Sequence, residues 1–276
     1  VNGTPQLPRT SSEPENGGAS PPLIELQAAD IASGDDRRGP VVKGVDWAVR
    51  TGDFWVIAGS TGSGKSRLLE TAAGLLPLAG GALLWFGQPL TKMSAESAAE
   101  LRRRIGLVFP DGGRLFPGLT VAQNIGLPIC YHRECSLNEA APRVEQLLAA
   151  AGLVPYADWA PTRLGRSYRQ RVALVRALAL EPAVLLLDNP LSGLDVRHSA
   201  WWVQFLTELS QGAPLLGGKP VTLVASADDL RPWSAVGKQF ALIRDNRWRL
   251  VGGPSELSAG TDPVLREMLA GLAGLA

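Results

Sequence analysis

The stretch Gly59-Ser60-Thr61-Gly62-Ser63-Gly64-Lys65-Ser66 has the residue types and spacing of a phosphate-binding loop, or P-loop. It follows the apolar run 54–58, which is typical of a strand buried on both faces, and it opens a helical pattern over 66–75. Glycines let the backbone wrap around phosphates with its N–H groups turned inward. Lys65 can reach the β- and γ-phosphates of ATP, and the Ser66 hydroxyl can bind Mg²⁺. The stretch therefore predicts an ATP·Mg²⁺ site.

A second apolar run ends in a carboxylate at a suitable distance along the chain. Residues 184–187 are typical of a buried strand, and Asp188 follows them directly. In P-loop proteins an Asp in this position, called Walker B, lies beside the Mg²⁺. We therefore predict Ser66 and Asp188 as the two metal-binding side chains.

Strands and helices alternate along the chain. The apolar runs 54–58, 184–187 and 221–225 are separated by helical patterns over 95–104, 139–151 and 169–180, and 240–251 has the pattern of a hairpin. This order is typical of an α/β domain with a mainly parallel sheet. With the P-loop, it predicts the RecA-like core of a P-loop nucleotide hydrolase.

The composition divides the 276 residues into three segments. Residues 1–22 are rich in Pro, Ser, Gly and Asn, so we expect a disordered tail without a secretory signal pattern. Residues 23–251 carry the predicted nucleotide-binding domain, and 252–276 form a helical C-terminal tail. Apolar residues make up 45% of the chain, which is enough for a large core.

Charge, cysteine content and hydropathy limit the possible partners. Lys plus Arg number 27 against 26 Asp plus Glu, a net charge of +1 that argues against nucleic acid as the main partner. Two cysteines, Cys130 and Cys135, fit a reducing compartment, and their spacing is not that of a zinc site. No apolar run approaches the ~20 residues that cross a bilayer. We therefore expect any work at a membrane to depend on a partner subunit.

The region 164–181, LGRSYRQRVALVRALALE, resembles the signature region of ABC-transporter ATPases, and 191–195, LSGLD, resembles their D-loop. The resemblance implies an antiparallel β subdomain and a helical signature subdomain around the parallel core. It also implies a homo- or heterodimer of cassettes that sandwiches two ATP molecules, each between the P-loop of one chain and the signature of the other. The residues that would act in trans are Gly165, Arg166, Ser167 and Tyr168 in the signature, and the D-loop residues are Ser192, Gly193, Leu194 and Asp195.

Two segments have a narrower resemblance. Residues 101–128 and 252–274 are similar to the corresponding parts of Mla-type ATPases, which drive lipid transport. That resemblance implies transmembrane permease subunits that contact the helical region near 109–128, and a cytoplasmic position on the inner face of the cell membrane. In the tail, Val264, Leu265, Met268, Leu269 and Leu272 fall on one helical face. This face would pack either on a neighbouring subunit or on its own domain.

The chain departs from the family pattern at groups that handle the attacking water. Asn189 stands where the family has a catalytic Glu, Ala227 replaces the His that follows the next strand, and Pro110 replaces the Gln of the Q-loop. An amide cannot accept a proton at neutral pH, and loss of a general base costs roughly 10²–10⁴ in rate. Asp111 is a candidate substitute for the missing Gln.

The signature and the adenine site also depart from the pattern. Arg166 adds bulk and charge where the family has glycine, Ser167 is a candidate for the displaced hydroxyl, and no aromatic residue lies near 31–35 to stack on the base. We therefore expect ATP binding with slow or absent hydrolysis. The competing hypotheses are a regulatory or structural pseudo-ATPase and an ATPase that positions water with other groups. We interpret the pair Trp201-Trp202 as core packing in preference to a binding surface.

Overall fold

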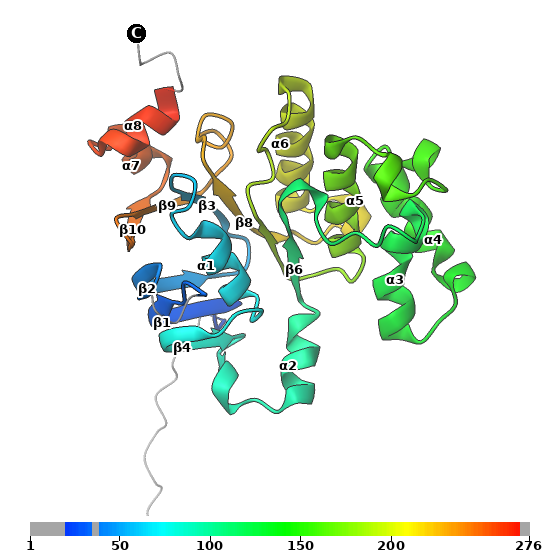
Figure 1. Ribbon diagram of the computed structural model, residues 1–276, viewed down its shortest axis with the longest axis horizontal. Helices are drawn as coiled ribbons and strands as arrows, with labels where there is room; N and C mark the ends of the chain where they lie inside the picture. Colours follow the sequence, from blue (N-terminus) through cyan, green and yellow to red (C-terminus); the bar gives the residue numbers. More distant parts are fainter. Residues whose placement is uncertain (1–19, 35–38, 271–276) are drawn as a thin grey trace, which may run out of the picture.

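The computed structural model describes residues 20–34 and 39–270 of the chain (Figure 1). Most of the expected disordered tail, and Leu272 of the C-terminal tail, lie outside these residues. The described residues form one ten-stranded sheet in the order β5-β4-β1-β2-β10-β9-β3-β8-β7-β6. The strands are β1 Ile24–Ile31, β2 Val42–Val49, β3 Phe54–Ala58, β4 Leu78–Trp85, β5 Gln88–Pro89, β6 Ile105–Val108, β7 Val184–Leu187, β8 Thr222–Ala227, β9 Gln239–Arg244 and β10 Arg247–Gly252.

The sheet has a parallel part and an antiparallel part. Strands β9, β3, β8, β7 and β6 are parallel neighbours, whereas β1, β2, β4 and β5 pair antiparallel. The two parts meet through β10 and β2, which share the single pair Arg247–Lys43. The predicted parallel core with an antiparallel subdomain is confirmed.

Eight α-helices cover the described sheet. They are α1 Lys65–Ala72, α2 Ala95–Arg102, α3 Val121–Arg133, α4 Leu137–Ala150, α5 Arg166–Leu178, α6 Val196–Gln211, α7 Pro254–Ala259 and α8 Pro263–Ala270. Short 3₁₀ turns lie at Leu90–Lys92, Pro110–Gly112, Val154–Tyr156, Pro161–Arg163 and Pro214–Leu216. Figure 1 shows α3 and α4 at the opposite end of the molecule from β1, β2 and β4, so the expected helical subdomain stands apart from the antiparallel one.

The side chains of strand β3 show that the parallel part of the sheet is covered on both faces. All five of its residues are buried. Phe54, Val56 and Ala58 join a core cluster with residues of α3, α4, α5 and α6, whereas Trp55 and Ile57 join a second cluster with α1 and the antiparallel strands. Successive side chains of a strand point to opposite faces, so this wholly apolar run is buried from both sides.

Several elements differ from the sequence prediction. Helix α5 begins at Arg166, three residues before the predicted start, and its N-cap Gly165 provides no side-chain hydrogen bond. The apolar pattern did not predict helix α3, because Gly126 and Pro128 interrupt it, although the family resemblance implied a helical region near 109–128. Its N-terminus nevertheless has a capping box: Thr120 Oγ1 accepts from Gln123 N at 3.2 Å, and Gln123 Oε1 accepts from Thr120 N at 2.8 Å.

The burial of side chains tests two predictions, one for the pair Trp201-Trp202 and one for the C-terminal helix. Trp202 is fully buried in the core, as the core-packing interpretation requires, while Trp201 stacks on Phe205 with ring centroids 4.9 Å apart. In the C-terminal segment, Leu265 of α8 is buried in the domain core, and Met268 O accepts a hydrogen bond from Leu230 N at 3.1 Å. Helix α8 therefore packs on its own domain.

Candidate nucleotide-binding site

The P-loop, residues 59–66, runs from the end of β3 into the first turn of α1, at the carboxyl end of the parallel strands. Gly62 and Gly64 have φ of 82° and 105°, which side chains other than glycine disfavour. A Cβ on Gly64 would also lie 2.8 Å from Val42 Cγ2, and one on Gly59 would lie 2.9 Å from Ile243 O. Glycine is therefore required by the backbone of this loop and by the packing around it.

Lys65 is the first residue of α1 and is nearly buried, with 6% of its surface exposed. Its Nζ donates to Gly59 O at 2.6 Å and Ser60 O at 2.9 Å, and forms an ion pair with Asp228 Oδ1 at 2.7 Å. An ammonium group has three N–H donors. Each donor of Lys65 therefore has an acceptor within the chain.

The ends of β7 and β8 carry a connected set of polar groups. Ser226 Oγ donates to Asp188 Oδ1 at 2.9 Å and accepts from Asn189 N at 2.9 Å. Asn189 Nδ2 donates to Asp228 Oδ2 at 2.7 Å. Because β3, β8 and β7 are adjacent and parallel, their carboxyl ends bring the P-loop, Asp228 and the Walker-B position to one edge.

The catalytic positions predicted to be substituted lie around this edge. Ala227 is the buried last residue of β8 and places only a methyl group there. Asn189 has φ of 44° and offers an amide directly after Asp188. Pro110 begins the short turn after β6. Strands β8 and β7 lie between β6 and β3 in the sheet, so Pro110 is farther from the P-loop than the other two positions along the sheet order.

The donor set fits Mg²⁺. Asp188 is buried, and one of its oxygens accepts from Ser226, which leaves further lone pairs on the carboxylate. Ser66 lies exposed in the first turn of α1, directly after Lys65. A carboxylate and a hydroxyl are the hard oxygen ligands that Mg²⁺ takes together with phosphate oxygens and water. When bound, the ion would neutralise phosphate charge.

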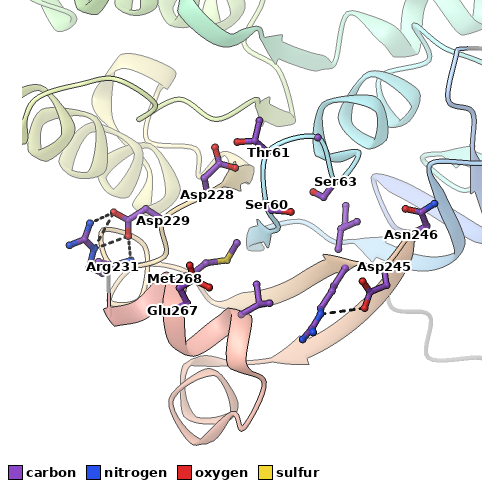
Figure 2. Close-up of a pocket in the computed structure, with 14 residues that line it drawn as sticks. Ser60, Thr61, Ser63, Asp228, Asp229, Arg231, Asp245, Asn246, Glu267 and Met268 are labelled. Atoms are coloured by element: carbon purple, nitrogen blue, oxygen red, sulfur yellow. Dashed lines mark hydrogen bonds and ion pairs between the residues drawn. The ribbon is translucent and has the colours of Figure 1, made fainter. Parts of the chain in front are cut away.

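A hollow of about 670 Å³ opens in front of the loop (Figure 2). Its walls come from the P-loop, from the segment after β8, from the β9–β10 turn and from α8. Figure 2 shows Asp228 next to the P-loop near Thr61, whereas Asp229 is turned towards Arg231. Arg231 donates to Asp229 at 2.6 Å, and this hydrogen bond lowers the pKa of Asp229 below its usual range.

The signature residues lie at the start of α5 and contact two other loops of the same chain. Arg166 forms an ion pair with Asp111, and its guanidinium lies against Gly193 of the D-loop. Tyr168 packs edge-on to His198, with ring centroids 5.9 Å apart. In the structure, Asp111 therefore pairs with the signature arginine, and Arg166 is held within its own chain.

The D-loop leads directly into α6. Asp195 is the N-cap of this helix and accepts from His198 N at 2.8 Å, a hydrogen bond that lowers the pKa of Asp195. Ser192 N donates to Asn189 O at 3.1 Å, so the loop folds back on the Walker-B strand. Gly193 and Asp195 are exposed, Leu194 is partly buried, and Val196 beside them is 87% exposed.

The family model described as ABC transporter matches residues 42–192, which span the P-loop, the signature, Asp188 and the first two residues of the D-loop, Leu191 and Ser192. The chain belongs to the ABC transporter family. It is a nucleotide-binding domain of that family, and the expectation drawn from the signature and D-loop is confirmed at this level.

Curated relatives support the same assignment. The chain is 33% identical over 217 residues to the spermidine/putrescine import ATP-binding protein PotA of Thermotoga maritima, which covers 79% of the chain and 55% of the relative. It is 36% identical over 215 residues to the sulfate/thiosulfate import ATP-binding protein CysA of Nephroselmis olivacea, covering 77% and 58%. The chain thus spans little more than half the length of these relatives.

Solved ABC cassettes have the same fold. CbiO1 from Clostridium perfringens, part of the ABC transporter complex cbiONQ, matches with a TM-score of 0.73 at 24% identity over 92% of the chain and 97% of cbiO1. The cassette MJ0796, solved as a dimer and as a dimer bound to ADP and Pi, matches with a TM-score of 0.73 at 26% identity over 84% of the chain and 100% of MJ0796.

For this ABC cassette, two site features were not predicted from the sequence. Asp228 contacts both Lys65 and Asn189; it directly follows Ala227 in the sequence, but its role was not predicted because both partners lie far from it along the chain. Arg166 was expected to face a partner chain, and its contact with Asp111 depends on the tertiary arrangement of α5 and the turn after β6. No helix in the described ranges, 20–34 and 39–270, has the length and apolar character to cross a membrane.

Proposed function

We propose that the chain binds ATP·Mg²⁺ as the energy-coupling subunit of a membrane transporter. The observation that carries the proposal is the loop between β3 and α1: Lys65 stands at the N-terminus of α1, and Asp188 directly follows β7, which is separated from β3 by the parallel strand β8. Helix N-termini and inward N–H groups favour phosphates. In this proposal the loop residues 59–66 hold the triphosphate, and Ser66 and Asp188 hold the metal.

We further propose that hydrolysis is slow. Asn189 donates its amide to Asp228 and has no proton-accepting group, while the methyl group of Ala227 offers γ-phosphate no hydrogen bond. Binding groups are thus retained and proton-handling groups are replaced. ATP would act by stabilising one arrangement of the complex through its differential affinity, since a ligand shifts an equilibrium without being cleaved.

A basic groove between α2, β6 and α3 supports a membrane subunit as partner. This basic groove has a volume of about 820 Å³, and no Asp or Glu lies among its described lining residues. Phe116, Leu127 and Tyr131 line it with exposed fractions of 51%, 37% and 77%. Its cations are Arg102, Arg103, Arg114 and Arg176.

Such a surface fits a short amphipathic segment with acidic side chains. Exposed aromatic and aliphatic groups beside arginines are typical of interface cores and their rims. His132 in the same groove is exposed, but partial desolvation and the nearby Arg103 lower its pKa and favour the neutral imidazole. The positive charge therefore comes from the guanidinium groups, which stay charged at all physiological pH values. We propose that the segment belongs to a transmembrane permease subunit at the inner face of the membrane.

A second cassette is the other proposed partner. The D-loop and the start of α5 expose Gly165, Gly193 and Val196 on adjacent parts of the chain. MJ0796 was solved as a dimer, which supports a dimer of cassettes here. The resemblance to ABC ATPases implies that the signature residues Gly165 to Tyr168 act on the partner's nucleotide in such a dimer. Either a homodimer or a heterodimer with an active cassette fits this proposal.

The transported substrate is proposed on resemblance. The segments 101–128 and 252–274 favour Mla-type lipid transport, while the curated relatives are ATP-binding proteins of spermidine/putrescine import and of sulfate/thiosulfate import. We propose lipid as the substrate and small-solute import as the competing outcome. A soluble partner in place of a permease would support the regulatory pseudo-ATPase.

The decisive experiment combines binding and partner identification. Mg²⁺-dependent titration with fluorescent ATP should give saturable binding that Lys65→Ala abolishes and Lys238→Ala, a surface control, leaves intact. Purification from native membranes should then recover a transmembrane subunit with the wild type and much less with Arg103→Glu. Absence of Lys65-dependent ATP binding by the folded protein would refute the proposed function.

A further inference from the structure

Lys65 already has a negatively charged partner at the place where ATP has to bind. The Asp228 carboxylate lies 2.7 Å from Lys65 Nζ, and two backbone carbonyls take the other two N–H donors. Because every donor of the ammonium is used, a γ-phosphate that binds Lys65 has to take the place of one acceptor. The carbonyls belong to the loop itself, so Asp228 is the acceptor that can leave.

Asp228 is held in this position from its other side. Asn189 Nδ2 donates to Asp228 Oδ2 at 2.7 Å, so the two carboxylate oxygens are divided between the ammonium and the amide. A glutamate at position 189, as the family has, would set two carboxylates against each other. The amide thus replaces a repulsion by a hydrogen bond, which gives Asn189 a positive role beyond the loss of a base.

The ion pair between Lys65 and Asp228 can open because the two side chains differ in their exposure to solvent. The Lys65 side chain is 7% exposed, whereas that of Asp228 is 38% exposed and borders the hollow in front of the P-loop. A carboxylate on the solvent side can swing into water and be hydrated there. Lys65 stays desolvated and needs an anionic partner, which the triphosphate supplies through charge-assisted hydrogen bonds.

We propose that the Asp228 carboxylate competes with nucleotide phosphates for the Lys65 ammonium. In this way Asp228 determines how tightly the P-loop binds a ligand and how much negative charge that ligand must carry. A triphosphate with its Mg²⁺ displaces Asp228, while ligands of lower charge compete poorly with it. This inference rests on the proposed ATP binding and adds an affinity-determining residue to it. Asp228 would weaken nucleotide binding, in contrast to the other polar side chains at this edge.

The neighbouring Asp229 provides a matched control. It is one residue further along and lines the same hollow, but its carboxylate is bound by Arg231 and is turned away from the P-loop (Figure 2). Asp228→Asn and Asp229→Asn each remove one negative charge. Only the first removes the partner of Lys65, so a general electrostatic effect and a competition at Lys65 predict different results.

The test is titration of the full chain with Mg²⁺ and fluorescent ATP, in the wild type and three variants. Asp228→Asn should tighten ATP binding about three- to tenfold, because ATP no longer has to break a part-exposed ion pair, whose free energy corresponds to a factor of about that size. Asn189→Ala frees one carboxylate oxygen and should tighten binding by a smaller factor. Asp229→Asn should stay within about twofold of the wild type.

Two outcomes would overturn the proposal. One is equal tightening by Asp228→Asn and Asp229→Asn, and the other is unchanged or weaker binding by Asp228→Asn. Asp228→Ser, checked by thermal melting, replaces Asp228→Asn if the latter does not fold. Failure of the proposed function is distinguishable, because the wild type would then show no Lys65-dependent ATP binding at all, whereas failure of this inference leaves that binding intact.

Discussion

Replacing Asn189 by glutamate tests whether the missing carboxylate limits hydrolysis. The Asn189 amide lies 2.7 Å from Asp228 Oδ2, so a glutamate in its place brings a second negative charge beside the first. Two unit charges 4 Å apart repel by about 4 kcal/mol at an effective dielectric constant of 20. That exceeds the ~1.5–3 kcal/mol of a hydrogen bond to a charged group, so we expect the two carboxylates to separate.

The new carboxylate should then act on water in front of the P-loop. A positioned general base contributes roughly 10²–10⁴ in rate, and because Ala227 and Pro110 still lack polar side chains we expect the lower limit, about 10²-fold over the wild type. Asn189→Gln is the control, since it has the length of glutamate without the charge and should give no gain. The assay is phosphate release under saturating Mg²⁺ and ATP.

The result is decided by comparing the two substitutions. If Asn189→Glu and Asn189→Gln release phosphate at the same rate, while both bind ATP and melt at wild-type temperature, the absence of a base is not what limits turnover. A wild type that turns over at the rate of ordinary transport ATPases would contradict the premise directly, because its hydrolysis would then proceed without a carboxylate at position 189.

Three further perturbations test the loop, the core and the turn after β8. Gly64→Ala forces a side chain into φ of 105° and should weaken ATP binding and lower the melting temperature, whereas Gly118→Ala, with open space around it, should change neither. Trp202→Ala removes a fully buried ring and should lower the free energy of unfolding by about 3–5 kcal/mol in a denaturant titration. Arg231→Gln should raise the pKa of Asp229 towards that of an exposed aspartate, followed by NMR. Because the folded pKa of Asp229 is depressed, its contribution to stability is present above the unfolded pKa and is lost as the pH falls through the folded value.

Local patterns in the sequence predicted the buried strands and the P-loop well. Strands β3 and β7 are wholly apolar because both faces of the sheet are covered, and that property is visible residue by residue. The loop glycines are likewise required by backbone angles that lie within the loop itself. Such features depend on neighbours in the chain, so they can be predicted from the sequence.

Features that depend on distant residues were missed. The Asp228–Lys65 ion pair joins the residue after β8 to the first residue of α1, and only the register of the adjacent parallel strands β8 and β3 brings them together. The bounds of helix α3 were missed for a different reason: the family resemblance implied a helical region near 109–128, and the capping box at Thr120 and Gln123 was available in the sequence, but Gly126 and Pro128 broke the periodic pattern. Strand β4 contains Gly80 and Gly81, which weakened its strand pattern in the same way.

The turn after β6 lies too close to α5 for either to shift alone. A Cβ on Gly112 would come within 2.6 Å of the backbone carbonyl oxygen of Arg169, and Asp111 is bound to Arg166. Phe109 and Arg114, on either side of this turn, line the basic groove. A segment that binds in the basic groove and displaces Phe109 or Arg114 would therefore also displace the start of α5, which carries the signature. Only the short turn after β6 lies between the groove and the signature.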